Sequence, residues 1–327
     1  MVLSTLKVEN VLRLCTKWLW YSESMKIGYV GLGKMGKNMV LRLIEQGVQV
    51  VAWNRSPEPV AEAAAAGAEK ADSPEDMIGR LQTPRVIWLM LPAGEVTEDM
   101  IQKLTPLLSA GDLIIDGANS YYKDTMRRAK LLTDKGIAYM DVGVSGGPDG
   151  ARNGACVMVG GKKADFDKQE ELFKAIAAPG AYKYLGEAGA GHFAKMVHNG
   201  IEYGMMEAIA EGAAILKAAE FNYNPGEVFG IYQSRSVIES RLVDWIREAL
   251  AEDPKLTGIT SVIAHTGEGE WTVKTARELK VPVPVIESSF EVRVNSVKDD
   301  PESPAGFRNK AVSAMRGKFG RHRVGKE

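Results

Sequence analysis

The glycine pattern at residues 31–36 constrains the fold of this chain more than any other feature. It follows a short apolar segment at 27–30, precedes a run with helical spacing, and is followed by a second apolar segment at 48–53. The first glycine permits a tight turn, the second lets the backbone approach a pyrophosphate, and the third lets helix and strand pack closely. The pattern comprises Gly31, Leu32, Gly33, Lys34, Met35 and Gly36. This order predicts a dinucleotide-binding unit, with a purely structural glycine turn as the alternative.

The residues after the second predicted strand bear on which dinucleotide would bind. NAD sites usually carry Asp or Glu here to bind the ribose hydroxyl. This chain instead has Asn54, Arg55 and Ser56 and no acid. Arg55 can pair with a 2′-phosphate, and Ser56 can hydrogen-bond to it. The turn therefore favours NADP over NAD, and the alternative is an exposed loop arginine with NAD accepted more loosely.

Strands continue to alternate with helices as far as residue 185, which predicts a doubly wound α/β domain of Rossmann type. The further strands are expected at 86–90, 113–116, 138–142, 157–159 and 183–185. After Gly186 only helical spacing remains. These helices are expected at 189–220, 226–232, 236–251, 270–279, 284–297 and 304–315. We therefore expect a dinucleotide domain at 25–188 and an all-helical substrate and dimerisation domain at 189–327. Residues 1–24 do not resemble the rest of the chain, and we interpret them as an added extension, or as a start assigned too far upstream of Met25, with a weak amphipathic targeting helix as the alternative.

Turns after the predicted strands carry candidate binding residues, because ligands of such sheets sit beyond the carboxyl ends of the strands. The turn Leu91, Pro92 and Ala93 and the later Asn119 are candidates for contacting the cofactor. Asn119 could also contact a substrate or be an ordinary polar turn residue. The turn Ser145, Gly146 and Gly147 offers a hydroxyl and unobstructed backbone N–H groups, which suit a small acid.

The helical run that begins at Gly191 carries the strongest catalytic candidates. Residues three, four and seven apart share one face of a helix. Lys195, His198, Asn199 and Glu202 have this spacing, so one face presents an amine, an imidazole, an amide and a carboxylate. The backbones of Lys195 and Glu202 lie about 10 Å apart on such a helix, and their side chains can converge on a small molecule. A solvated face or simple helix packing remains the alternative.

Composition excludes several classes of function. The chain of 327 residues has 41 basic and 42 acidic residues, a net charge of −1 that gives no case for nucleic acid or a membrane surface. Cys15, Cys156 and the four histidines lack ligand spacing, so we expect no metal site. No apolar stretch approaches the length of a membrane span. Two cysteines without a disulfide framework suit a reducing compartment, which predicts a cytoplasmic protein.

These motifs together resemble the 6-phosphogluconate dehydrogenase family in its short form, within the β-hydroxyacid dehydrogenase superfamily. The resemblance extends from Met25 nearly to the end of the chain, and its parts are G-L-G-K-M-G at 31–36, N-R-S at 54–56, D-V-G-V-S-G-G-P-D-G-A-R-N-G at 141–154 and G-A-G-H-F-A-K-M-V-H-N-G-I-E-Y-G at 189–204. The last segment is the most specific. The wider superfamily usually has Asn-Asn where this chain has His198-Asn199, and it lacks the Ile-Glu-Tyr that comes next here.

The resemblance implies NADP-linked, metal-independent oxidative decarboxylation of 6-phosphogluconate to ribulose 5-phosphate and CO2, with Lys195 as general base and Glu202 as general acid. The substrate contacts that it implies are Asn119, Ser145, Gly146, Gly147, His198, Asn199, Tyr203 and Arg293. Arg316 and His322 match the family's tail motif R-x-x-F-G-x-H, which would reach the neighbouring subunit's site in a homodimer. A frayed basic C-terminus is the alternative.

One departure from the family concerns the substrate phosphate. The long form carries K-G-T-G-K-W-T, whose first lysine contacts the phosphate, whereas residues 266–272 here read T-G-E-G-E-W-T, close to the short form's own pattern but acidic. Arg293, Arg316 and Tyr203 would therefore have to hold the phosphate.

Two alternative functions differ from this one in the residues that they would need. A dehydrogenase of a small, unphosphorylated 3-hydroxy acid would need neither His198 nor the tail motif. A catalytically silent NADP-binding sensor would need neither Lys195 nor Glu202. The presence of all these features favours the decarboxylating dehydrogenase.

Overall fold

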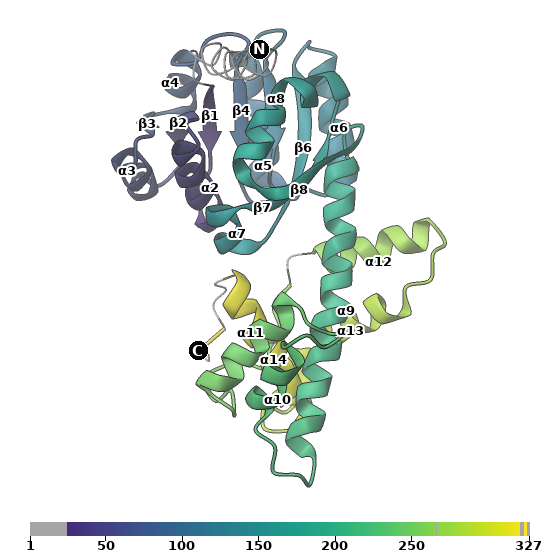
Figure 1. Cartoon of the computed structure of the whole chain (residues 1–327). Helices are drawn as coiled ribbons and strands as arrows, with labels where there is room; N and C mark the ends of the chain where they lie inside the picture. The colour runs from purple at the N-terminus through teal and green to yellow at the C-terminus, as the bar shows by residue number, and fades with distance from the viewer. Residues whose placement is uncertain (1–24, 266, 321–323, 326–327) are drawn as a thin grey trace, which may run out of the picture.

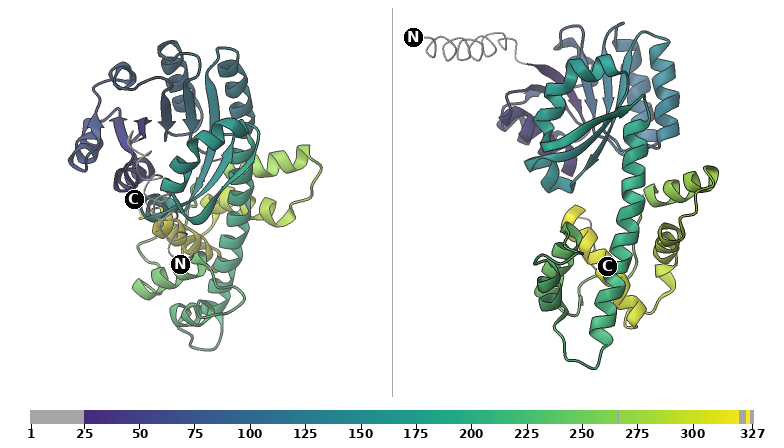
Figure 2. Two further views of the ribbon diagram at one scale, coloured as in Figure 1. Left: turned by 45° about the horizontal axis from the view of Figure 1, so that its top comes forward. Right: turned by 45° about the vertical axis from the view of Figure 1, so that its right-hand side comes forward.

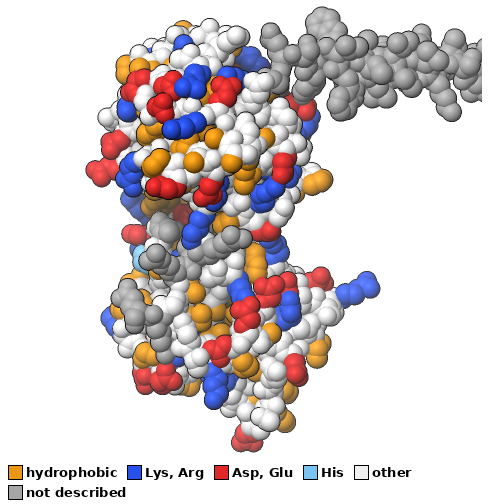
Figure 3. All heavy atoms as spheres, turned by 90° about the vertical axis from the view of Figure 1, so that its left-hand side faces the viewer, with side chains coloured by type: hydrophobic (Ala, Val, Ile, Leu, Met, Phe, Trp, Pro, Cys, Tyr) orange, Lys and Arg blue, Asp and Glu red, His pale blue; other side chains and the backbone are white. Residues whose placement is uncertain are grey.

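The computed structural model describes residues 25–265, 267–320 and 324–325, so the extension at 1–24, Thr266 and His322 lie outside the described residues. A sheet domain and a helical domain are joined by one long helix, α9 (Ala190–Ala218), which runs from the first into the second (Figure 1). This confirms the predicted class of a Rossmann-type domain followed by a helical one. Acidic and basic side chains are interspersed over the face shown in Figure 3, with no large patch of one sign among the described residues there.

Eight strands of the described chain form one sheet in the order β3-β2-β1-β4-β5-β6-β7-β8. Their bounds are β1 (Lys26–Val30), β2 (Gln49–Trp53), β3 (Glu69–Lys70), β4 (Val86–Leu89), β5 (Leu113–Asp116), β6 (Ala138–Ser145), β7 (Ala155–Gly160) and β8 (Ala177–Gly186). All neighbours are parallel except β6 and β7, which are antiparallel. The sequence did not predict β3, because its two exposed residues carry no pattern, and it predicted only the last part of β8.

Helices cover both faces of the sheet, as parallel strands require. They are α2 (Lys34–Glu45), α3 (Pro57–Ala65), α4 (Pro74–Gly79), α5 (Glu95–Leu104), α6 (Tyr122–Thr133), α7 (Gly147–Asn153) and α8 (Lys163–Ile176), with a 3-10 turn, η1, at Thr105–Leu107. Trp88 and Phe173 belong to the core on one face, and Met77 and Leu104 belong to the core on the other. The two cores hold the sheet rigid, so the turns at its carboxyl edge have a fixed support.

The helical domain is arranged around the lower part of α9. Its elements are α10 (Pro225–Tyr232), α11 (Arg241–Glu252), α12 (Glu268–Glu278), α13 (Pro284–Asn295), the 3-10 turn η2 (Ser296–Lys298) and α14 (Pro304–Gly320). Helices α12 and α13 lie on one side of α9, and α10 and α11 lie on the other (Figure 2). The expected start of α11 at residue 236 is wrong, because the Ser240 hydroxyl accepts a hydrogen bond from Val243 N and caps the helix there.

The first turn of α9 is anchored directly on the sheet. The Asp141 carboxylate on β6 accepts hydrogen bonds from Gly189 N and His192 N, both at 2.7 Å. A Cβ on Gly191 would lie 2.5 Å from the Met158 carbonyl oxygen on β7, and one on Gly143 would lie 2.5 Å from Lys195 Cβ. Only glycine permits this approach, so Lys195 is held against β6 by backbone packing.

Candidate active site

The face of α9 predicted to be catalytic forms one connected cluster. Lys195 is only 6% exposed, and its Nζ donates a hydrogen bond to Asn199 Oδ1 and lies 3.4 Å from His198 Nδ1. His198 Nδ1 lies 2.9 Å from the same Asn199 oxygen, and His198 Nε2 lies 3.2 Å from Ser145 Oγ. A neutral imidazole protonated on Nδ1 satisfies both the amide and the hydroxyl contacts. The structure therefore joins the turn after β6 to the face of α9.

Burial favours the uncharged forms of the two basic groups in this cluster. It lowers the pKa of Lys195, and the negative charges of Glu268 and Glu202 oppose this change. The pKa of His198 is lowered first by burial and then by the nearby Lys195. A buried amine loses its proton more readily because the low-dielectric surroundings disfavour the charge. Lys195 therefore has the environment that a general base of the amine type needs.

Glu202 lies one turn beyond His198 on the same face. Its Oε2 is 3.8 Å from His198 Nδ1, and its side chain remains partly open to solvent. The amine of Lys195 and the carboxylate of Glu202 thus lie on opposite sides of the imidazole along the helix. This order can place a proton acceptor and a proton donor at two atoms of one small molecule. Their assignment as base and acid stays a prediction.

A second cluster beside the first carries unpaired positive charge. Arg293 on α13 is 3% exposed, and its guanidinium carbon lies 3.3 Å from the centre of the Tyr203 ring. Its Nη2 meets Met206 Sδ at 3.5 Å, while its Nε has no hydrogen-bond partner among the described residues. No carboxylate of the described residues lies within 4 Å of Arg293 or of Arg316 on α14. Burial lowers the pKa of both arginines.

Two buried guanidinium groups without acid partners are costly unless an anion joins them. Tyr203 packs between this cluster and the start of α12, where a Cβ on Gly269 would overlap the Tyr203 ring. Glu268, in the same turn, contributes negative charge to the surroundings of Tyr203 and Arg316. Sequence reasoning noted that this motif is acidic and lacks the lysine, but it did not select Glu268 as a site residue. The acidic departure itself was the available signal.

The turn Ser145–Gly147 also meets the end of the helical domain. Gly147 has a φ of +62°, and a Cβ there would overlap the carbonyl oxygen of Phe319. The end of α14 therefore lies against the turn that carries Ser145, and Arg316 lies one turn earlier on the same helix. Within the single chain, Arg316 thus belongs to the surroundings of its own Tyr203. The expected reach of the tail into a neighbouring subunit stays a prediction, and His322 is outside the described residues.

Asn119 positions the same turn from the sheet side. Its Oδ1 accepts a hydrogen bond from Val144 N at 2.9 Å, and its Nδ2 donates to Val144 O at 3.2 Å. Asn119 has a φ of +54°, a conformation that asparagine tolerates better than most residues. Its amide therefore fixes the end of β6 next to Ser145. Its predicted contacts with cofactor and substrate stay predictions.

The predicted dinucleotide turn has the shape that a pyrophosphate requires. A Cβ on Gly31 would overlap the Met90 carbonyl oxygen, and one on Gly36 would overlap the Gly31 carbonyl oxygen. Gly33 has open space where its Cβ would be, at the N-terminus of α2. This opening fits a phosphate group that approaches the free N–H groups of the helix. The turn Leu91, Pro92 and Ala93 adjoins it, because Leu91 Cδ2 lies 2.9 Å from the position of a Gly31 Cβ.

Asn54 connects the turn at residues 54–56 to the glycine turn at residues 31–36. Its Oδ1 accepts a hydrogen bond from Leu32 N at 2.9 Å, and its Nδ2 donates to Ser56 O at 3.0 Å. Asn54 thus holds the two turns together, while Lys34 and Met35 begin α2. Arg55 and Ser56 are exposed, and the Ser56 side chain makes no capping hydrogen bond to α3. Their side chains can therefore reach a ligand at this edge.

The described residues include neither a candidate metal site nor a helix that could span a membrane. No group of three or more His, Cys, Asp and Glu side chains within them could hold a metal ion. None of the helices in the described ranges is long and apolar enough to cross a membrane.

Comparisons with known proteins agree over both domains. The model of the NAD binding domain of 6-phosphogluconate dehydrogenase matches residues 26–188, and that of its C-terminal domain matches residues 191–323. The Bacillus subtilis protein YqeC, provisionally named a 6-phosphogluconate dehydrogenase, is 43% identical over 303 residues, which are 93% of this chain and 100% of that protein. An NAD(+)-dependent, decarboxylating 6-phosphogluconate dehydrogenase of Haloferax volcanii is 38% identical over 305 residues, 93% of this chain and 99% of that one.

A solved structure shows the same likeness in three dimensions. The 6-phosphogluconate dehydrogenase of Plasmodium falciparum, determined in its apo form and in complexes with NADP+ and with 6-phosphogluconate, has a TM-score of 0.77 and 30% identity. The match covers 89% of this chain and 70% of that protein. The remainder of the Plasmodium chain has no counterpart in this match, as expected for a shorter form.

Proposed function

The chain belongs to the 6-phosphogluconate dehydrogenase family, and from this premise we propose how its residues carry out the oxidative decarboxylation of 6-phosphogluconate. One observation supports the proposal above the others. The buried amine of Lys195 and the buried, acid-free guanidinium groups of Arg293 and Arg316 adjoin the same stretch of α9. A phosphorylated hydroxy acid matches both clusters at once, whereas an unphosphorylated 3-hydroxy acid leaves the arginines without a partner.

The first chemical step needs a base at the substrate's C3 hydroxyl. Neutral Lys195 accepts the hydroxyl proton while the C3 hydride leaves, and the nicotinamide of the bound cofactor supplies the acceptor for that hydride. Asn199 and His198 hold the amine in place, and the lowered pKa of Lys195 keeps a larger fraction of it neutral near pH 7. The amine therefore begins the reaction in the form that can take a proton.

The second step needs an acid on the other side of the substrate. The 3-keto acid loses CO2, because its ketone can accept the electron pair of the breaking carbon–carbon bond. Glu202 then donates a proton to the carbon that lost CO2, which gives ribulose 5-phosphate. Ser145, with the backbone N–H groups of Gly146 and Gly147, would hold the carboxyl end, and Asn119 would keep that turn in position.

The phosphate of the substrate would bind between Arg293, Arg316 and Tyr203. Arginine forms charge-assisted, bidentate hydrogen bonds with phosphate, and the tyrosine hydroxyl can add another. This arrangement would make up for the lysine that residues 266–272 lack. We place the domain division at residue 188, so that 25–188 binds the cofactor and 189–327 binds the substrate.

For the cofactor we propose NADP over NAD. Support comes from the exposed Arg55 and the uncapped Ser56 hydroxyl at the end of β2, where residues 54–56 include no acid. The relatives differ in this respect, since the Haloferax protein is named as NAD(+)-dependent and the Plasmodium structure holds NADP+. The choice therefore depends on the residues of this chain.

We also propose that the chain acts as a homodimer, in which the tail residues that follow Arg316 complete the neighbouring site. Exposed apolar side chains on neighbouring parts of α9 and α13 support this proposal, because a partner subunit could cover them. They include Ile201, Met205, Val285 and Val294. Sedimentation velocity tests the assembly, and mixing a Lys195→Met chain with an Arg316→Gln chain tests the tail. Recovered activity in the mixture would support a shared site, and none would place Arg316 in its own chain's site.

The reaction itself is tested by measuring cofactor reduction and trapped CO2 from 6-phosphogluconate, in parallel with an unphosphorylated 3-hydroxy acid. We expect equal amounts of reduced cofactor and CO2 from the sugar acid. Activity on the unphosphorylated acid alone, without CO2, would contradict the proposal.

A further inference from the structure

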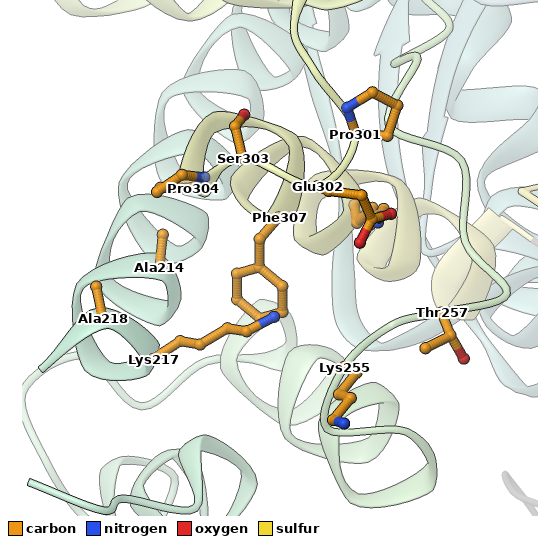
Figure 4. A pocket seen from close by; sticks show the side chains of 11 residues that line it. Ala214, Lys217, Ala218, Lys255, Thr257, Pro301, Glu302, Ser303, Pro304 and Phe307 are labelled. Carbon is orange, nitrogen blue, oxygen red and sulfur yellow. The ribbon is translucent and has the colours of Figure 1, made fainter.

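A cavity of about 400 Å³ lies at the far end of α9, between Ala214–Ala218, the first turn of α14 and the loop around Lys255 (Figure 4). Lys217 follows Lys195 by 22 positions on the same helix. At 1.5 Å of rise per residue, the two lysines are about 33 Å apart. The cavity is therefore separate from the candidate active site.

Three lysines line this cavity, and only one of them has an acid partner among the described residues. Lys310 is 4% exposed, and its Nζ lies 3.1 Å from Glu302 Oε1. Within the described ranges, no carboxylate lies within 4 Å of the ammonium groups of Lys217 or Lys255. Lys217 Nζ instead lies 3.6 Å from the centre of the Phe307 ring. Burial and the positive charges of Lys310 and Lys255 lower the pKa of Lys217, and the negative charges of Glu302 and Asp253 oppose this change.

Helix α14 adds to this positive potential. It has 17 residues, begins at Pro304 on the rim of the cavity, and has no acidic residue in its first turn. The N-terminus of a helix carries a partial positive charge that attracts anions. The hydroxyls of Ser303 and Thr257 also line the cavity. Three ammonium groups and a helix N-terminus thus surround a cavity near which Glu302 and Asp253 supply the opposing negative charge, so an anion that enters finds a positive potential.

We propose that this cavity binds a small phosphate monoester at a site distinct from that of the substrate. Several ammonium groups around one cavity suit the several oxygens of a phosphate, and Lys217 and Lys255, which have no carboxylate within 4 Å among the described residues, are available to contact it. Phe307 and Ala214 provide apolar surface for the organic part of the ligand. The volume falls within the range of about 300–1,000 Å³ that small-molecule sites occupy.

Equilibrium dialysis with radiolabelled inorganic phosphate tests the site. The full-length chain is used with Arg293→Gln and in saturating NADP+, so that binding at the proposed substrate site and at the dinucleotide turn does not obscure the result. We expect saturable binding, and we expect Lys217→Gln with Lys255→Gln to weaken it at least about tenfold, because hydrogen bonds to charged groups are lost. Both lysines are exposed, so the double variant should fold, and it should keep its dehydrogenase activity when Arg293 is present.

The matched control is Lys183→Gln with Lys280→Gln, which removes two exposed lysines elsewhere and should leave phosphate binding unchanged. Glucose 6-phosphate and adenosine monophosphate are then added as competitors. The one that displaces more labelled phosphate shows whether the ligand is a sugar phosphate or a nucleotide. Equal binding by the cavity variant and the control would overturn the proposal, as would a lack of saturable binding in the Arg293→Gln chain. Failure of both competitors would rule out a monoester.

Discussion

The candidate-site cations of the helical domain and the candidate cofactor arginine of the dinucleotide domain are set in opposite surroundings. Lys195, Arg293 and Arg316 are buried, and burial lowers the pKa of all three. Arg55, at the end of β2, is exposed. A buried charge without an acid partner costs stability until a ligand joins it, whereas an exposed charge is solvated at almost no cost.

The difference in burial between these cations indicates which part of the proposed site is specialised for one ligand. If the proposed assignments hold, folding alone prepares the buried groups for proton transfer and for an anion, so these positions should tolerate little change. Arg55 would gain a charge partner only when the cofactor binds, so relatives could differ there without loss of stability. Substitutions should therefore have large effects in the buried set and small effects at the exposed turn.

The largest effect is expected for Lys195→Met, which keeps the length of the side chain and removes the base. General-base catalysis contributes about 10²–10⁴-fold, so kcat should fall by that factor while the binding of the reduced cofactor, followed by its fluorescence, stays the same. Lys280→Met, at an exposed position, is the matched control. In the unmodified enzyme, kcat/KM should rise with pH as Lys195 loses its proton, starting below the ordinary lysine pKa range. Turnover within tenfold of the unmodified enzyme would remove Lys195 from this role.

The next effect concerns a buried acid in the same domain. Glu207 on α9 is 5% exposed, its Oε1 lies 3.1 Å from Arg308 Nε, and burial raises its pKa to about 7. The folded state therefore holds this proton more tightly than the unfolded state, whose carboxyl has its ordinary pKa near 4.5. The free energy of unfolding should fall as the pH rises from about 4.5 to about 7, by up to about 3 kcal/mol.

Glu207→Gln should abolish that loss, because an amide does not titrate. Urea unfolding of both chains at pH 5 and pH 8 measures the difference. The variant should gain about 2–3 kcal/mol relative to the unmodified chain between these two values. Parallel changes in the two chains would mean that Glu207 ionises normally in the folded state.

Arg293→Gln should separate ligand binding from stability. Loss of a charge-assisted contact costs about 1.5–3 kcal/mol, so kcat/KM for 6-phosphogluconate should fall roughly 10- to 100-fold. Without substrate, the same change removes a buried charge that has no acid partner among the described residues, so the melting temperature should rise. A lower melting temperature with unchanged kinetics would show that Arg293 supports the fold instead.

The cluster on α9 could be predicted because helical spacing alone places Lys195, His198 and Asn199 together. The contact between His198 and Ser145 could not, since 53 positions separate them and only tertiary packing joins them. Asp141 was not selected for a related reason. A carboxylate inside a buried strand gives no sign that it will accept two N–H groups from the start of α9.

The contacts of polar side chains in turns were equally hard to predict, because such a side chain can hydrogen-bond either to the chain's own backbone or to a ligand. The sequence placed Asn119 and Asn54 at the correct turns, but both amides hydrogen-bond to the backbone of the chain. The acidic motif that contains Glu268 was visible in the sequence, but the effect of Glu268 on Lys195 could not be predicted, because tertiary packing alone brings the two together.

The smallest effect is expected at the exposed turn, with Arg55→Gln. A solvated arginine gains a 2′-phosphate partner only in the complex, and exposed charge pairs contribute about 0–1 kcal/mol, or somewhat more when bidentate. The KM for NADP should therefore rise about 5- to 10-fold, while the KM for NAD and the melting temperature stay the same. Initial rates with both cofactors at saturating 6-phosphogluconate measure this, and Arg235→Gln, at another exposed position, is the control. Equal losses with NADP and NAD would show that Arg55 does not read the 2′-phosphate. A loss of activity as large as that of Lys195→Met would contradict the comparison between the buried and exposed cations. The exposed Arg55 would then matter to activity as much as the buried Lys195 does.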